Sequence, residues 1–228
     1  MGWLDRLFTR LGSKGPNPPS LVGAYYRAWC GRCANVDTPE NPELRAAWQE
    51  ALTGIDRVAF EREMRLLDLF AAVEALNEGP WHGPFASAFV KLIACRMILE
   101  QSTDIDSKIQ GTLQEIGTLA HLDQRLLEFL AHAQGGSHIL ALIKKRLQDY
   151  RAILAMGWHP ASIRLGAYAV EAMTTGYPSS DDFVNDEIWM DKLRKGGRAG
   201  NMFLNQVVWI HYVNSRGFFQ EICSAIGA

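Results

Sequence analysis

The chain has 228 residues, of which 48% are apolar and 21% are charged, the balance of a globular protein with one domain or two small ones. The net charge is −2, whereas a dedicated nucleic-acid binder usually carries a surplus of basic residues. This difference argues against a nucleic-acid partner. The four scattered cysteines do not form a disulfide framework, and no secretory leader or membrane-spanning run is evident. We therefore expect the protein to be cytoplasmic.

The first predicted element is a short amphipathic helix over residues 1–12. Residues 13–20 follow as a Pro/Gly linker that cannot continue this helix. A helix of this length is marginal in water alone, so we expect it to dock on a partner, on the body or, weakly, on a membrane surface. The alternative is that this terminal segment is disordered. Its apolar face, at helical spacing, consists of Trp3, Leu4, Leu7, Phe8 and Leu11.

Residues 21–228 predict a single all-α body of stacked antiparallel helices. Apolar residues recur at helical spacing, and Gly-Pro and Gly-Gly breaks separate the segments. No run alternates like a strand, and Asn-Gly and Asp-Gly hairpin signals are missing. The expected helices cover residues 20–34, 41–52, 56–77, 84–101, 104–119, 122–133, 137–156, 160–175, 180–194, 200–214 and 217–226.

Two stretches of the body resemble each other. Residues 65–82 run from Arg-x-x-Asp to Trp-His, and residues 146–159 repeat this order. This similarity suggests two helical repeats, residues 56–134 and 137–216, which would stack to bury their apolar faces. The alternative is that helix–turn–helix patterns recur by chance. Both interpretations predict a layered helical array.

The run Trp29-Cys30-Gly31-Arg32-Cys33 resembles the thioredoxin active-site sequence Trp-Cys-Gly-x-Cys over five residues. The resemblance implies a redox pair in which a helix N-terminus lowers the pKa of the first cysteine. No βαβ pattern follows Cys33. The all-α alkylhydroperoxidase D family also uses a Cys-x-x-Cys pair, but the histidine that follows its second cysteine is missing here. Cys30 and Cys33 are therefore redox candidates, with a structural helix face as the alternative.

Two Trp-His pairs, Trp81-His82 and Trp158-His159, occupy the corresponding turns of the two similar stretches. Tryptophan is enriched at binding hot spots and histidine titrates near neutral pH, so these residues are binding candidates. The structural alternative is that each tryptophan covers a helix start while its histidine bonds a backbone carbonyl. No nucleophile or metal-ligand spacing accompanies them, and we expect no metal and no cofactor.

The leading hypothesis is a non-enzymatic interaction or adaptor protein that binds a protein partner. Residues 1–12 would add peripheral contact with a membrane surface. The first alternative is a thiol-disulfide redox protein that uses Cys30 and Cys33. The second is a helical small-molecule-binding protein with the two Trp-His pairs near the mouth of its pocket.

Overall fold

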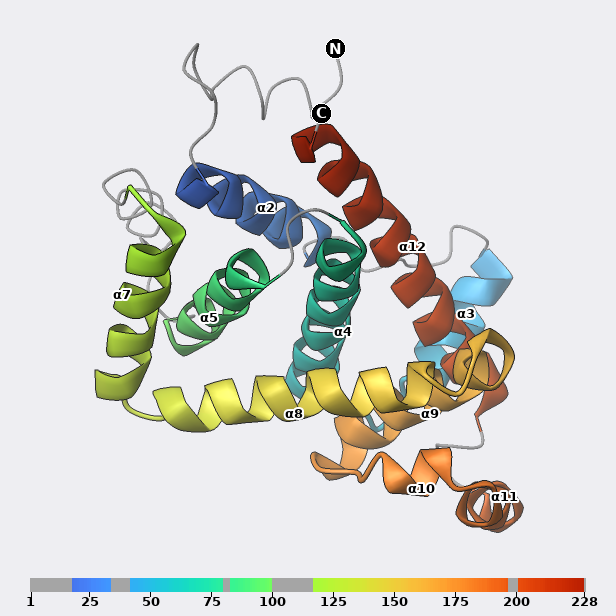
Figure 1. Cartoon of the computed structure of the whole chain (residues 1–228). Helices are drawn as coiled ribbons and strands as arrows, with labels where there is room; N and C mark the ends of the chain where they lie inside the picture. The colour runs from blue at the N-terminus through green and yellow to red at the C-terminus, as the bar shows by residue number, and fades with distance from the viewer. Residues whose placement is uncertain (1–17, 34–41, 80–82, 100–116, 197–200, 228) are drawn as a thin grey trace. The chain divides into compact units, whose positions relative to one another are not determined.

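The computed structural model describes residues 18–33, 42–79, 83–99, 117–196 and 201–227 (Figure 1). Every regular element in these ranges is helical, so the all-α prediction is confirmed for the described part of the chain. None of the described helices is long and apolar enough to cross a membrane. The helices are α2 (Pro18–Cys33), α3 (Pro42–Ala51), α4 (Arg57–Glu78), α5 (Pro84–Ile98), α7 (Leu119–His132), α8 (Gly136–Leu154), α9 (Trp158–Thr175), α10 (Asp181–Val184), α11 (Asp186–Lys195) and α12 (Met202–Gly227).

Two predicted boundaries were wrong. The helix expected over 180–194 is divided at Asn185, whose backbone is extended (φ −77°, ψ 120°) and whose side chain accepts hydrogen bonds from the first turn of α11. The break expected between 200–214 and 217–226 does not occur, because α12 continues through Gly217. Apolar side chains are buried on both sides of that glycine, so packing holds the helix together there. Most of the helix predicted over 104–119 lies outside the described residues.

The chain forms two compact units. Unit 1 comprises residues 1–32, 72–144 and 216–228, and unit 2 comprises residues 33–71 and 145–215. Helices α4, α8 and α12 each contribute residues to both units. A duplication over 56–134 and 137–216 is not shown and stays a prediction.

Unit 1 is centred on Tyr25 of α2, which is fully buried. Its hydroxyl donates a hydrogen bond to the carbonyl of Ala72 at 2.8 Å and accepts a weak one from the thiol of Cys223 at 3.6 Å. Its ring lies edge-on to Phe89 of α5, with ring centroids 4.9 Å apart, and 5.4 Å from the ring of Phe219 in α12. This single tyrosine therefore connects α2 to three other helices, α4, α5 and α12.

Helix α7 packs on α5 through one apolar face in unit 1. Thr118 caps α7 by accepting a hydrogen bond from the backbone N–H of His121, as expected for a threonine before a helix. Lys91 of α5 bonds Asp123 of α7, with 2.5 Å between Nζ and Oδ2. The buried face of α7 consists of Leu122, Leu126 and Leu130.

Unit 2 has a continuous aromatic core that we call the aromatic chain. Eight rings follow one another with successive centroids 4.8–5.8 Å apart, in edge-on, tilted and stacked geometries. Such pairs contribute about 0.5–1.5 kcal/mol each beyond the burial of their area. In order of contact the rings are Trp158, Trp209, Tyr212, Phe70, Tyr150, Tyr168, Phe183 and Trp189.

Two cations attach α10 and α11 to α9 in unit 2. Arg164 of α9 donates to the carbonyl of Phe183 at 2.9 Å and to Asp186 at 2.5 Å, and its guanidinium lies over the ring of Trp189. Lys192 of α11 bonds Glu171 of α9 at 2.7 Å. These contacts hold α10 and α11 against α9, and Phe183 and Trp189 are buried.

Candidate functional site

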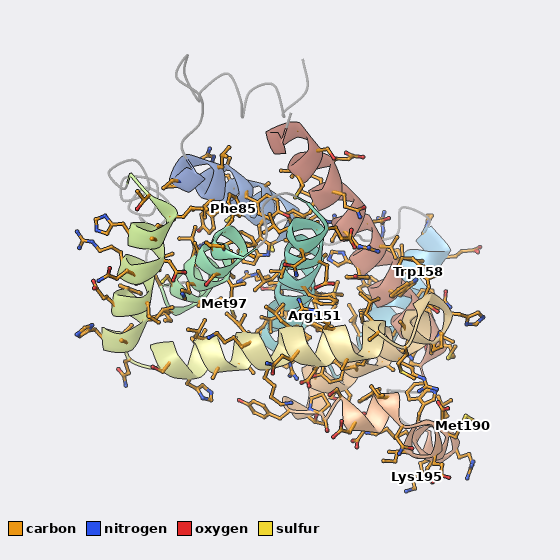
Figure 2. All side chains as sticks on the ribbon, in the orientation of Figure 1. Phe85, Met97, Arg151, Trp158, Met190 and Lys195 are labelled. Carbon is orange, nitrogen blue, oxygen red and sulfur yellow. The ribbon has the colours of Figure 1, made fainter. Side chains whose placement is uncertain are left out.

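The most exposed tryptophan in the described chain is Trp158, the first residue of α9 (Figure 2). The residue before it, Gly157, has φ +93°, a conformation that favours glycine and turns the chain sharply into the helix. The side chain of Trp158 is 53% exposed, and its ring lies edge-on to Trp209 of α12 with centroids 4.8 Å apart. One side of this large ring is therefore in contact with Trp209, while about half of the residue is open to solvent.

The two segments that meet at Trp158 and Trp209 carry no charged side chain. Residues 152–163 and 201–215 contain no Asp, Glu, Lys or Arg, although these types make up 21% of the whole chain. Met202 is 44% exposed and Ile210 is 50% exposed on α12. Helical spacing puts Met202, Trp209 and Ile210 within about 100° of one another around that helix. We call this surface the Trp158 face.

None of the polar side chains exposed in these segments is Asp, Glu, Lys or Arg. They include His159 beside Trp158, and Gln206 and Asn214 on α12. The centre of a protein–protein interface is depleted in charged residues and enriched in aromatic residues and methionine, with polar residues around it. The composition of the Trp158 face is of this kind, and it differs from the scattered single apolar residues of an ordinary surface.

A buried polar contact supports α12 beneath this face. Asp68 of α4 accepts hydrogen bonds from His211 Nε2 at 2.8 Å and from Ser215 Oγ at 2.5 Å, and all three side chains are at most 1% exposed. Both donors use the same carboxylate oxygen, Oδ1 of Asp68. These two hydrogen bonds connect α12 to α4.

A second buried polar cluster lies around Arg146 of α8. Arg146 Nε is 3.3 Å from Glu63 Oε1, and its Nη1 donates to the hydroxyl of Tyr168 at 2.7 Å. That hydroxyl in turn donates to Asp149 Oδ2 at 2.6 Å. The hydroxyl of Tyr150 donates to the same oxygen of Glu63. Each charge in the cluster therefore has an opposite charge or a hydroxyl beside it, as buried ions require.

Burial sets the protonation states in this cluster. It raises the pKa of Glu63, and the nearby Arg146 only partly offsets that effect. It also raises the pKa values of the Tyr150 and Tyr168 hydroxyls, so both stay protonated and act as donors near neutral pH. The arrangement pairs two tyrosine hydroxyls with two carboxylate acceptors inside the core of unit 2.

The redox candidates Cys30 and Cys33 lie in the last turn of α2, and both are half-buried thiols. The thioredoxin-like sequence thus closes a helix here, whereas in that family it opens one. The C-terminal end of a helix carries partial negative charge, which disfavours a thiolate. A redox role for this pair stays a prediction.

The structure brings together only part of the predicted binding set. Trp158 and His159 are both exposed at the start of α9. The other members of that set lie outside the described residues: Trp3, Leu4, Leu7, Phe8, Leu11, Trp81 and His82.

Sequence reasoning missed the α12 half of the Trp158 face and both buried clusters. The uncharged run over 201–215 was an available signal for the face. Glu63 and Asp68 interrupt the apolar positions of a helical pattern, and a charged residue at such a position signals a buried polar partner. The partners themselves come from α8 and α12 and have no sequence signal.

Within the described ranges, no three His, Cys, Asp or Glu side chains gather in a way that could hold a metal ion. A hollow of about 490 Å³ lies on α7 in unit 1, lined by Arg125, Glu128, Phe129, His132 and Ala133. None of the residues predicted for a ligand pocket lines it. No family model, no curated protein and no solved structure matches this chain.

Proposed function

We propose that this protein is a non-enzymatic interaction protein that binds a protein partner through the Trp158 face. The observation that carries the proposal is the exposure of Trp158 on a surface whose two segments hold no charged side chain. A tryptophan supported on one side and open on the other is a typical hot-spot residue, because it buries a large rigid area at little entropic cost.

The character of the face indicates the kind of partner. An acidic or basic surface on the partner would lose its hydration against this face and gain no ion pair in return. An apolar helix face loses nothing of this kind and can pack against Trp158, Met202 and Ile210. We therefore propose that the partner offers an amphipathic helix that turns its apolar side toward the Trp158 face.

The test is affinity purification of the tagged full chain from its native host in three forms: wild type, Ile210→Asp and Val58→Asp. Ile210 is half exposed on the face, and Val58 is 71% exposed on α4 and serves as the matched control. A charge buried at an interface core costs about 2 kcal/mol or more, which corresponds to roughly a 30-fold loss of affinity. We expect Ile210→Asp to lose a partner that Val58→Asp retains.

Identical partner lists from the two variants would contradict the proposal. Circular dichroism of each purified variant establishes that the helices are intact. Sedimentation velocity of the wild type distinguishes one special outcome, in which the partner is a second copy of the chain. A role of residues 1–12 in partner or membrane binding stays a separate prediction, and deletion of residues 1–20 in the same purification tests it.

A further inference from the structure

We propose that the aromatic chain of unit 2 conducts an electron hole from the exposed Trp158 to the buried tyrosines Tyr150 and Tyr168. The oxidant is a strong one-electron oxidant in solution, and it acts at the exposed indole. This inference is independent of the proposed function, since it concerns the rings beneath the Trp158 face and needs no partner.

The rings from Trp158 to Tyr150 form a continuous series of contacts. Tryptophan and tyrosine are the aromatic side chains that lose an electron most readily, and transfer between them is fast where the rings are in contact. Trp158 and Trp209 have centroids 4.8 Å apart. From Trp209 the contact continues to Tyr212 at 5.4 Å, and Tyr212 stacks on Phe70 with an interplanar angle of 19°. These two rings bridge the indoles to the ring of Tyr150, which lies 5.2 Å from Phe70.

Two tyrosines within the aromatic chain, Tyr150 and Tyr168, can accept the positive charge. An oxidised tyrosine is a strong acid, so its oxidation is favourable only where a base takes the hydroxyl proton at the same time. The Tyr150 hydroxyl donates to Glu63 Oε1, and the Tyr168 hydroxyl lies 2.6 Å from Asp149 Oδ2. Both hydroxyls keep their protons near neutral pH because burial raises their pKa values. Each tyrosine therefore has a proton to release and a carboxylate to receive it.

The oxidant takes one electron from the indole of Trp158 and is reduced by one electron. Trp209 passes an electron to Trp158, and Tyr150 supplies an electron to Trp209 across the bridging rings. The O–H bond of Tyr150 breaks and its proton forms a new O–H bond on Glu63. Both indoles are restored, and the product is a neutral tyrosyl radical beside a protonated carboxyl.

The radical can move one ring further, to Tyr168. The two tyrosine rings are edge-on with centroids 5.4 Å apart. When Tyr168 gives an electron to Tyr150, its own proton passes to Asp149 and the proton on Glu63 returns to Tyr150. The radical then lies in the core of unit 2, where Tyr150 and Tyr168 are both fully buried.

Flash photolysis of the full chain with tris(bipyridine)ruthenium and a sacrificial electron acceptor tests the proposal. Transient absorption and electron paramagnetic resonance then measure the yields of tyrosyl and indole radicals. The parent for all comparisons is Tyr177→Phe, because Tyr177 is 64% exposed and the oxidant would reach it directly. In that background we expect Trp158→Phe to lower the tyrosyl yield about threefold or more, since the exposed relay is lost.

The matched control is Trp48→Phe. Trp48 is a buried indole of unit 2 whose recorded ring contact is with Phe60, outside the aromatic chain. This change should leave the tyrosyl yield as it is in the parent. The combined change Tyr150→Phe and Tyr168→Phe should lower the yield as Trp158→Phe does. Deuterated solvent should slow tyrosyl formation in the parent, because the hydroxyl proton moves with the electron.

Equal tyrosyl yields in the parent and in Trp158→Phe would overturn the proposal. An equal decrease of the tyrosyl yield in Trp48→Phe would also overturn the proposal, because the yield would then not depend on the aromatic chain. Trp158 is exposed, so its replacement should leave the fold intact, and circular dichroism checks this. The comparison therefore stands even if the double tyrosine variant fails to fold.

Discussion

Helices α9 and α12 approach each other closely at Gly166, and a single added methyl group there tests the packing of unit 2. A Cβ on residue 166 would lie 2.2 Å from the carbonyl oxygen of Asn205 and 2.8 Å from its Cα. These are backbone atoms of α12 and cannot rotate away, so the helices must separate by about 1 Å to restore an ordinary contact. The residues on either side of Gly166 are fully buried, so the two helices cannot separate without disturbing the surrounding core.

The expected free-energy change follows from two opposing terms. Overpacking a core usually costs about 1–3 kcal/mol, and here the contact is with backbone. The gain in helix propensity from glycine to alanine offsets up to about 1 kcal/mol. We therefore expect Gly166→Ala to lower the free energy of unfolding by about 2 kcal/mol and Tm by about 4–8 °C for a chain of this size.

Gly217 provides the matched control. It also lies inside a helix, but a Cβ added there meets no atom within 4 Å. Gly217→Ala should therefore raise the free energy of unfolding by up to about 1 kcal/mol. Urea unfolding followed by circular dichroism measures both variants. If Gly166→Ala raised stability as much as Gly217→Ala, the close approach of α9 to α12 would be refuted.

Three further predictions concern single side chains. Arg146→Met should lower the free energy of unfolding by about 3–5 kcal/mol, because it leaves Glu63 buried without its cation. In urea unfolding, adding Glu63→Leu to it should recover most of that loss, and a loss under about 1 kcal/mol from Arg146→Met alone would contradict the ion pair. Asn185→Ala should cost about 1 kcal/mol by removing the cap of α11, while Gln206→Ala, at an exposed position within α12, should cost little in the same assay. In a timed alkylation at about pH 8, read by peptide mass spectrometry, Cys30 and Cys33 should react before Cys95, since only the thiolate reacts. Burial raises the pKa of the Cys95 thiol to about 12, so its labelling should accelerate as the pH rises toward that value, and early labelling of Cys95 would contradict its burial.

The helices themselves were predictable because their signals are local. Apolar spacing and the capping residues placed most described helices within three residues of their observed ends, as at Pro84 for α5 and Pro42 for α3. Gly217 shows the limit of local signals. Glycine alone weakens a helix, but the apolar neighbours that α12 buries on both sides of it outweigh that cost.

The candidate site was only half predictable. The similarity between the two Trp-His turns led to Trp158 and His159, and both are exposed. Nothing near them in sequence leads to Trp209 or Ile210, which lie about 50 residues further along the chain. Their role depends on which face of α12 meets α9, and helix packing decides that.

The sequence by itself determined the fold class and the positions of most helices, since both follow from hydrophobic periodicity and turn chemistry within a few residues. Only the tertiary structure decided that eight aromatic rings form one chain and that Glu63 and Arg146 are buried together. Those contacts join residues that are far apart in the sequence. Their geometry is set by how whole helices pack, and no local pattern of residues encodes it.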